Sequence, residues 1–117
     1  AKAKVDAVKD GAERSYWTGR LAEANGEEEV AIGHYAKAVR DGDDSGEQRL
    51  ARLLEHPKCG TRVAALEAIS GLKLKSARAR VAALAEKGGP GDGERVLIFA
   101  GCDSKRSAAR VLAELGE

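Results

Sequence analysis

The stretch from Tyr16 to Gly42, Y-W-T-G-R-L-A-E-A-N-G-E-E-E-V-A-I-G-H-Y-A-K-A-V-R-D-G, decides the fold. Its apolar residues recur at helical spacing on both sides of Asn25-Gly26. This pair tolerates the left-handed backbone that a helix end needs. We therefore expect two antiparallel helices joined by a tight turn, and the second carries Val30, Ala31 and Tyr35.

The composition favours helices packed on helices. Of the 117 residues, 43% are hydrophobic but only 3% are aromatic, so the core must be built from small side chains. Small side chains bury enough area only where helices approach closely. The net charge is +1, which gives no reason to expect a nucleic acid or a membrane surface as the partner.

The hairpin resembles one tetratricopeptide repeat over Tyr16–Asp43. Gly19, Ala31, Tyr35 and Ala38 stand twelve, four and three residues apart, as in that family. The resemblance implies that the small residues let two helices touch while the tyrosine fills the space between them.

Further amphipathic helices are expected on either side of the hairpin. Leu53-Leu54 and Pro57, followed by Arg62-Val63, resemble a HEAT-type repeat. The two resemblances imply an all-α fold of antiparallel helix pairs, stacked as a short right-handed superhelix. The helices are expected within Lys2–Arg14 and at Gln48–His56, Thr61–Leu72, Leu74–Lys87 and Ser104–Leu115.

We expect a single domain over residues 1–117. It would hold the tetratricopeptide-like hairpin at 1–45 and HEAT-like helices at 46–117. Four glycines and a proline in Gly88–Gly93 predict a flexible loop that contributes nothing to the core. The apolar run Arg95–Phe99 suits a buried strand or a buried helix, and we expect a helix because no second strand is found to pair with it.

Cys102 carries the main alternative, an enzyme. The strand-like run, a loop with Cys102 and a following helix with Lys105 and Arg106 resemble the active-site turn of rhodanese-like sulfurtransferases. That resemblance implies a reactive thiolate at a helix N-terminus. With only Cys59 besides, we expect neither a disulfide framework nor a zinc site.

A basic cluster in K-L-K-S-A-R-A-R carries a second alternative, nucleic-acid binding. On a helix Lys73, Lys75, Arg78 and Arg80 spread over roughly 250° of arc, so they make no single stripe. No aromatic residue is interleaved for base stacking. A solvated helix face is the expected role.

The predicted function is a protein–protein interaction module, a scaffold or adaptor that binds a peptide or protein partner in a concave groove. Trp17, Arg20, Asn25 and His34 are the predicted partner-binding residues, since Trp and Arg are common interface anchors. We expect no enzymatic activity, cofactor, metal or membrane span, and a cytoplasmic location. The first residue is not Met, which indicates a cut or processed start, so a fragment of a longer chain stays an open alternative.

Overall fold

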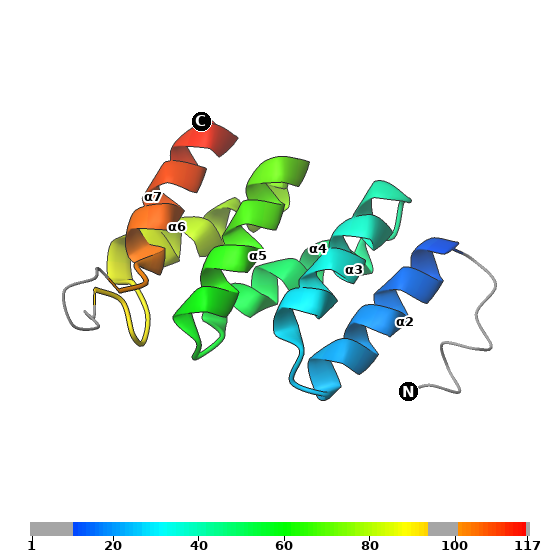
Figure 1. Cartoon of the computed structure of the whole chain (residues 1–117). Helices are drawn as coiled ribbons and strands as arrows, with labels where there is room; N and C mark the ends of the chain where they lie inside the picture. The colour runs from blue at the N-terminus through cyan, green and yellow to red at the C-terminus, as the bar shows by residue number, and fades with distance from the viewer. Residues whose placement is uncertain (1–10, 94–100, 117) are drawn as a thin grey trace. The chain divides into compact units, whose positions relative to one another are not determined.

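Helices make up every regular element of residues 11–93 and 101–116, the parts of the chain that the computed structural model describes (Figure 1). The all-α prediction is confirmed for these residues. The first part of the expected 2–14 helix and the run Arg95–Phe99 lie outside the described residues. The elements are α2 (Gly11–Ala24), α3 (Glu28–Arg40), α4 (Ser45–Arg52), η1 (Leu53–Glu55), α5 (Cys59–Leu72), η2 (Lys75–Ala77), α6 (Arg78–Lys87) and α7 (Ser104–Leu115), where η marks a 3₁₀ turn.

The chain divides into two compact units, and the boundary falls inside α4, between Leu50 and Ala51. The first unit contains the predicted hairpin, and the helix predicted at Gln48–His56 spans the boundary.

In the first unit, α2 and α3 lie antiparallel and meet where Gly19 faces Tyr35 (Figure 1). A Cβ atom on Gly19 would lie 2.7 Å from Cε1 of Tyr35 and 3.2 Å from the carbonyl oxygen of Ala31. Tyr35 is fully buried, with 0% of its surface exposed. The prediction that Gly19 allows close approach and Tyr35 fills the space is confirmed.

The hydroxyl group of Tyr35 joins three helices. It donates to Oε1 of Glu23 on α2 at 2.5 Å, and Oε2 of Glu23 pairs with Nη2 of Arg49 on α4 at 2.6 Å. Burial raises the pKa of Tyr35, and the neighbouring Glu23 raises it further. The phenol therefore stays protonated and serves as a donor.

Helix α4 also approaches α3 through a glycine. A Cβ atom on Gly46 would lie 2.7 Å from the carbonyl oxygen of Tyr35 and 2.9 Å from Cγ2 of Val39. Val30 on α3, by contrast, is 50% exposed. Ala31, Tyr35 and Ala38 lie on the buried face of α3, so Val30, one residue before Ala31, points outward.

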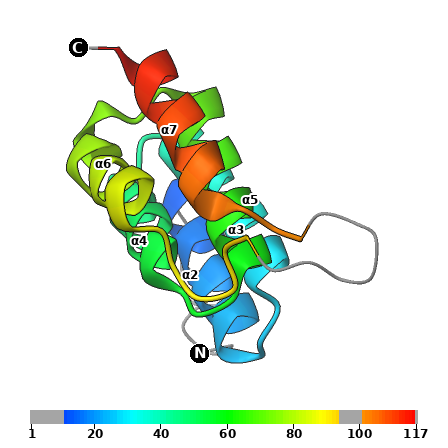
Figure 2. The same cartoon turned by 90° about the vertical axis from the view of Figure 1, so that its left-hand side faces the viewer.

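In the second unit, α7 lies beside both α5 and α6 (Figure 2). Helices α5 and α7 run parallel, because three contacts join them at a nearly constant offset: Cys59–Cys102, Glu67–Arg110 and Ser70–Glu114. Their apolar faces enclose the core of this unit. Its buried apolar residues include Leu53, Leu54, Ala65, Leu66, Ile69, Leu74, Ala77, Val81, Leu84, Ala108, Val111 and Leu115.

Gly19→Ala should destabilise the first unit by about 1–3 kcal/mol, because the added methyl group overpacks the contact with Tyr35. Gly33→Ala is the matched control, since a Cβ atom there would meet nothing within 4 Å. That substitution should stabilise α3 by about 0.5–1 kcal/mol through helix propensity. Urea unfolding followed by circular dichroism measures both. Equal effects of the two substitutions would contradict the close contact.

Candidate functional site

Two of the four predicted partner-binding residues, Trp17 and Arg20, lie together on α2. The rings of Tyr16 and Trp17 pack edge to face with their centroids 5.1 Å apart. Cζ of Arg20 lies 6.0 Å from the Tyr16 centroid and 5.8 Å from the Trp17 centroid, and its Nη1 donates to the Tyr16 hydroxyl at 3.1 Å. The aromatic pair therefore already receives one cation, in the geometry that ring faces favour.

Asn25 and His34 lie at other places in the first unit. Asn25 is exposed in the turn between α2 and α3, where its backbone N–H donates to the carbonyl of Leu21 at 3.1 Å. His34 is half-buried on α3. Neither residue lines the hollow beside Trp17.

A hollow of about 540 Å³ lies beside the aromatic pair, between the first turns of α2 and the turn that joins α3 to α4. Tyr16 and Trp17 form an aromatic wall, and four of the other lining residues are acidic. None of the described residues that line the hollow is basic. The lining residues are Ala12, Glu13, Tyr16, Trp17, Asp41, Gly42, Asp43, Asp44 and Ser45.

The antiparallel hairpin brings these acids to the aromatic pair, because the end of α3 lies beside the start of α2. Asp41 follows the last residue of α3, and Oδ1 of Asp43 accepts from the backbone N–H of Ser45 at 2.8 Å. Asp44 is exposed. Acids before α4 and in the first turn of α2 also stabilise the N-termini of those helices. Together with the aromatic wall, they give the hollow the chemistry that suits a lysine or arginine side chain.

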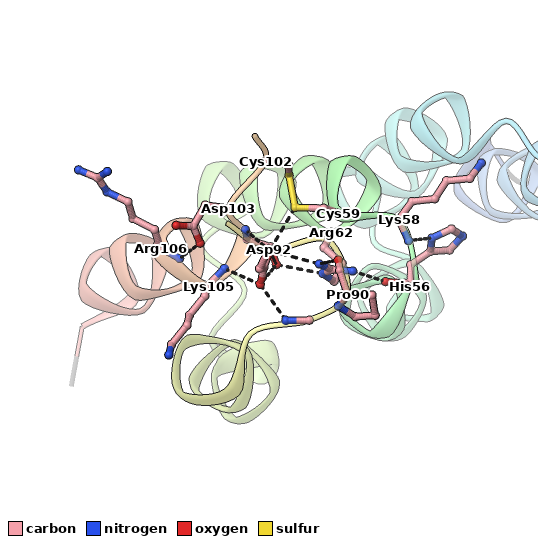
Figure 3. Close-up of a disulfide and its surroundings, with 12 residues drawn as sticks. His56, Lys58, Cys59, Arg62, Pro90, Asp92, Cys102, Asp103, Lys105 and Arg106 are labelled. Atoms are coloured by element: carbon pink, nitrogen blue, oxygen red, sulfur yellow. Dashed lines mark hydrogen bonds and ion pairs between the residues drawn. A yellow bond between two sulfur atoms is a disulfide. The ribbon is translucent and has the colours of Figure 1, made fainter. Parts of the chain in front are cut away.

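The second unit is built around a buried arginine (Figure 3). Arg62 on α5 is only 1% exposed, and a buried charge of this kind is tolerated only when it is paired and hydrogen-bonded. Its guanidinium group donates to acceptors from separate parts of the chain: Oγ of Ser104 (2.9 Å), the carbonyls of His56 (2.8 Å), Pro57 (3.2 Å) and Pro90 (2.5 Å), and Oδ1 of Asp92 (3.2 Å).

Asp92 is the anionic partner of Arg62, and its side chain is 12% exposed. Its carboxylate accepts from the backbone N–H groups of Gly89 (2.7 Å), Ser104 (2.6 Å) and Lys105 (3.2 Å), and from the hydroxyl of Ser104 (2.7 Å). Burial alone would raise the pKa of Asp92, but the hydrogen bonds from Ser104, Gly89 and Arg62 together lower it below its usual value. The carboxylate is therefore ionised at neutral pH.

The loop Gly88–Gly93 holds this carboxylate, which corrects the expectation that the loop contributes nothing to the core. A Cβ atom on Gly89 would lie 2.7 Å from Cζ of Arg62, and one on Gly88 would lie 2.9 Å from Oδ2 of Asp92. These two glycines allow the backbone to approach the ion pair closely. The glycine-rich composition predicted a flexible loop, but here the glycines allow the backbone to pack against buried polar side chains.

Cys59 and Cys102 form a disulfide, which the sequence analysis did not predict when it expected no disulfide framework. They are 43 residues apart in the sequence, but the parallel arrangement of α5 and α7 brings the N-terminal ends of both helices together. Both sulfurs are used in this bond. The oxidised protein therefore has no free Cys102 thiol for the rhodanese-like chemistry considered above.

The basic cluster is partly engaged in contacts within the second unit. Nε of Arg78 donates to the carbonyl of Gly116 at 2.9 Å, and Nη1 of Arg80 pairs with Oε2 of Glu55 at 3.2 Å. Two of the four cations thus have intramolecular partners. The nucleic-acid alternative stays untested by these contacts.

Within residues 11–93 and 101–116, no group of three or more His, Cys, Asp or Glu side chains is placed to hold a metal ion. Among the described helices, none has the length and apolar character to cross a bilayer.

No protein-family model matches this chain, and no curated protein or solved structure is significantly similar to it. The tetratricopeptide-like and HEAT-like resemblances therefore stay predictions.

Sequence reasoning missed the acidic side of the hollow, although a usable signal was present. In an antiparallel hairpin the residues after the second helix must lie near the first turns of the first helix. The acidic turn at Asp41–Asp44 could therefore have been placed beside Tyr16 and Trp17. No comparable signal joined Arg62 to Asp92.

Asp92→Asn should destabilise the second unit by about 3–5 kcal/mol near neutral pH, because it leaves the buried guanidinium of Arg62 uncompensated. The folded-state pKa of Asp92 is depressed, so its contribution is present above the unfolded-state pKa and is lost as the pH falls toward the folded-state value. The stability difference between wild type and variant should therefore shrink at a pH of about 2.5.

Asp103→Asn is the control for this prediction. Asp103 caps α7 by accepting from the backbone N–H of Arg106 at 3.0 Å, and asparagine caps helices equally well. Chemical unfolding at both pH values measures the three proteins. A difference between wild type and Asp92→Asn that stays constant with pH would argue against an ionised Asp92 in the folded state.

Proposed function

We propose that this chain is a helical binding module whose first unit takes up a lysine or arginine side chain of a peptide or protein partner. The hollow beside Tyr16 and Trp17 is the observation that carries this proposal, because it combines an aromatic wall with four carboxylates and no basic lining residue. Trp17 keeps its predicted role as a contact residue. The acidic residues add the charge that selects the partner.

The position of Arg20 supports a cation as the ligand. Its guanidinium group lies within about 6 Å of both ring centroids, which is the distance range of favourable cation–π contacts. The same aromatic pair lines the hollow, whereas Arg20 does not. In this proposal Arg20 braces the rings from one side, and the partner's cation enters on the side of the carboxylates.

The helix arrangement supports the broader role as a repeat-like scaffold. The parallel pair α5 and α7 has an offset of 43 residues at its disulfide, which lies within the period of HEAT-type helix pairs. Gly19 and Tyr35 make the contact that the tetratricopeptide resemblance implies. Scaffolds of helix pairs commonly bind peptides or proteins.

Trp17 is the only tryptophan of the chain, so its fluorescence reports directly on the hollow. A short lysine-rich peptide without aromatic residues should change this fluorescence saturably, and a peptide with glutamine at each lysine position should not. The double variant Asp41→Asn, Asp44→Asn should weaken binding about tenfold, because two charges near the cation are lost at roughly 0.7 kcal/mol each. Binding should also weaken with salt.

Glu29→Gln is the matched control, since Glu29 is an exposed acid on α3 that does not line the hollow. It should leave the affinity unchanged. Circular dichroism of each variant checks that the helices next to the removed acids stay folded. Equal weakening by Glu29→Gln and by the double variant would show that only the net charge matters, and the hollow would lose its assignment.

A further inference from the structure

The two sulfur atoms of the disulfide lie in different surroundings (Figure 3). Cys59 is the first residue of α5 and is only 9% exposed. Its Sγ lies 3.2 Å from Oδ1 of Asp92, and because a disulfide sulfur carries no proton this is a contact and not a hydrogen bond. Cys102 precedes α7 and is half-buried, so it is the more exposed residue of the two.

This asymmetry decides which sulfur an external thiol can attack. The attacking group in thiol–disulfide exchange is a thiolate, which carries a negative charge. The carboxylate of Asp92 repels such a group at Cys59, and the burial of Cys59 restricts access further. Both the repulsion by Asp92 and the restriction by burial are weaker at Cys102.

We propose that the Cys59–Cys102 bond is a reversible redox site that exchanges with small thiols or protein dithiols through Cys102, while the cluster of Arg62, Asp92 and Ser104 keeps the second unit folded in both redox states. In the first step a thiolate attacks Sγ of Cys102, a new S–S bond forms, and the bond to Cys59 breaks. The sulfur of Cys59 leaves with the electron pair and takes up a proton. A second thiolate then attacks the external sulfur of the mixed disulfide and frees Cys102. In total, two thiols become one disulfide and the protein disulfide becomes two thiols.

The hydrogen bonds around the site do not depend on the disulfide. Asp92 holds the backbone and hydroxyl of Ser104 at the start of α7, and the backbone N–H of Gly93 donates to the carbonyl of Cys102 at 3.0 Å. After reduction, the thiol of Cys59 lies where it can donate to Oδ1 of Asp92, 3.2 Å away. In this hydrogen bond the thiol of Cys59 keeps its proton and does not act as a nucleophile. The backbone of Cys102 stays in place, so the disulfide can form again.

The single-cysteine variants Cys59→Ser and Cys102→Ser are a matched pair that separates the two sulfurs. With oxidised glutathione near pH 7, Cys102 in the first variant should form the mixed disulfide at least about tenfold faster than Cys59 in the second. Reduced wild-type protein should keep its helical circular dichroism and should form the intramolecular disulfide again in a glutathione buffer.

Wild-type protein gives a test that does not require any variant to fold. During slow reduction by glutathione, mass spectrometry of the trapped intermediate should place the adduct on Cys102. An adduct mainly on Cys59, or equal rates for the two single-cysteine variants, would overturn the proposed asymmetry. Loss of helical circular dichroism on reduction would show that the bond is a structural staple, and it would overturn the proposed reversibility.

Discussion

The contact between the Tyr35 ring and Gly19 sets the geometry on which the candidate site depends. It fixes how closely α2 and α3 approach, and the Tyr35 hydroxyl extends the contact through Glu23 to Arg49 on α4. Because the hairpin is antiparallel, this one crossing places the start of α2 beside the turn between α3 and α4. The aromatic pair and the carboxylates of the hollow meet as a consequence, and the Tyr16 ring lies 5.8 Å from the Tyr35 ring at this crossing.

The second unit follows the same principle with a charged side chain. Among residues 11–93 and 101–116, Arg62 and Tyr35 are the two largest fully buried side chains, one in each unit, and both carry a polar tip that must be satisfied. Arg62 requires Asp92 and backbone carbonyls as partners, since an unpaired buried charge is strongly destabilising. This requirement explains why a loop rich in glycine is held close to α5. Because the core is poor in aromatic residues, one large side chain fills space in each unit where other proteins would use several.

Local patterns predicted the helices well, whereas contacts between distant residues were not visible in the sequence. The helix Ser104–Leu115 was predicted with the observed bounds, because its apolar spacing and the cap at Asp103 are local signals. The helix predicted at Thr61–Leu72 begins two residues earlier, at Cys59.

The disulfide and the Arg62–Asp92 pair join residues 43 and 30 positions apart, and no spacing rule connects such partners. The glycines at 88 and 89 predict a flexible loop. Composition alone does not distinguish a free loop from a backbone that must pass close to a buried side chain. In the hollow, Trp17 could be predicted because tryptophan is rare in this chain. Its acidic neighbours could be predicted only from the antiparallel geometry of the hairpin.

Nuclear magnetic resonance mapping tests the central claim, a cation site at the hollow, most directly. The measurement follows the backbone amides and the Trp17 indole N–H while a lysine-rich peptide is added to the full chain. The account predicts shifts that concentrate at Glu13, Tyr16, Trp17 and residues 41–45, with small changes at acids such as Glu29 and Glu86. Shifts spread evenly over all exposed acidic residues, or confined to the second unit, would contradict it.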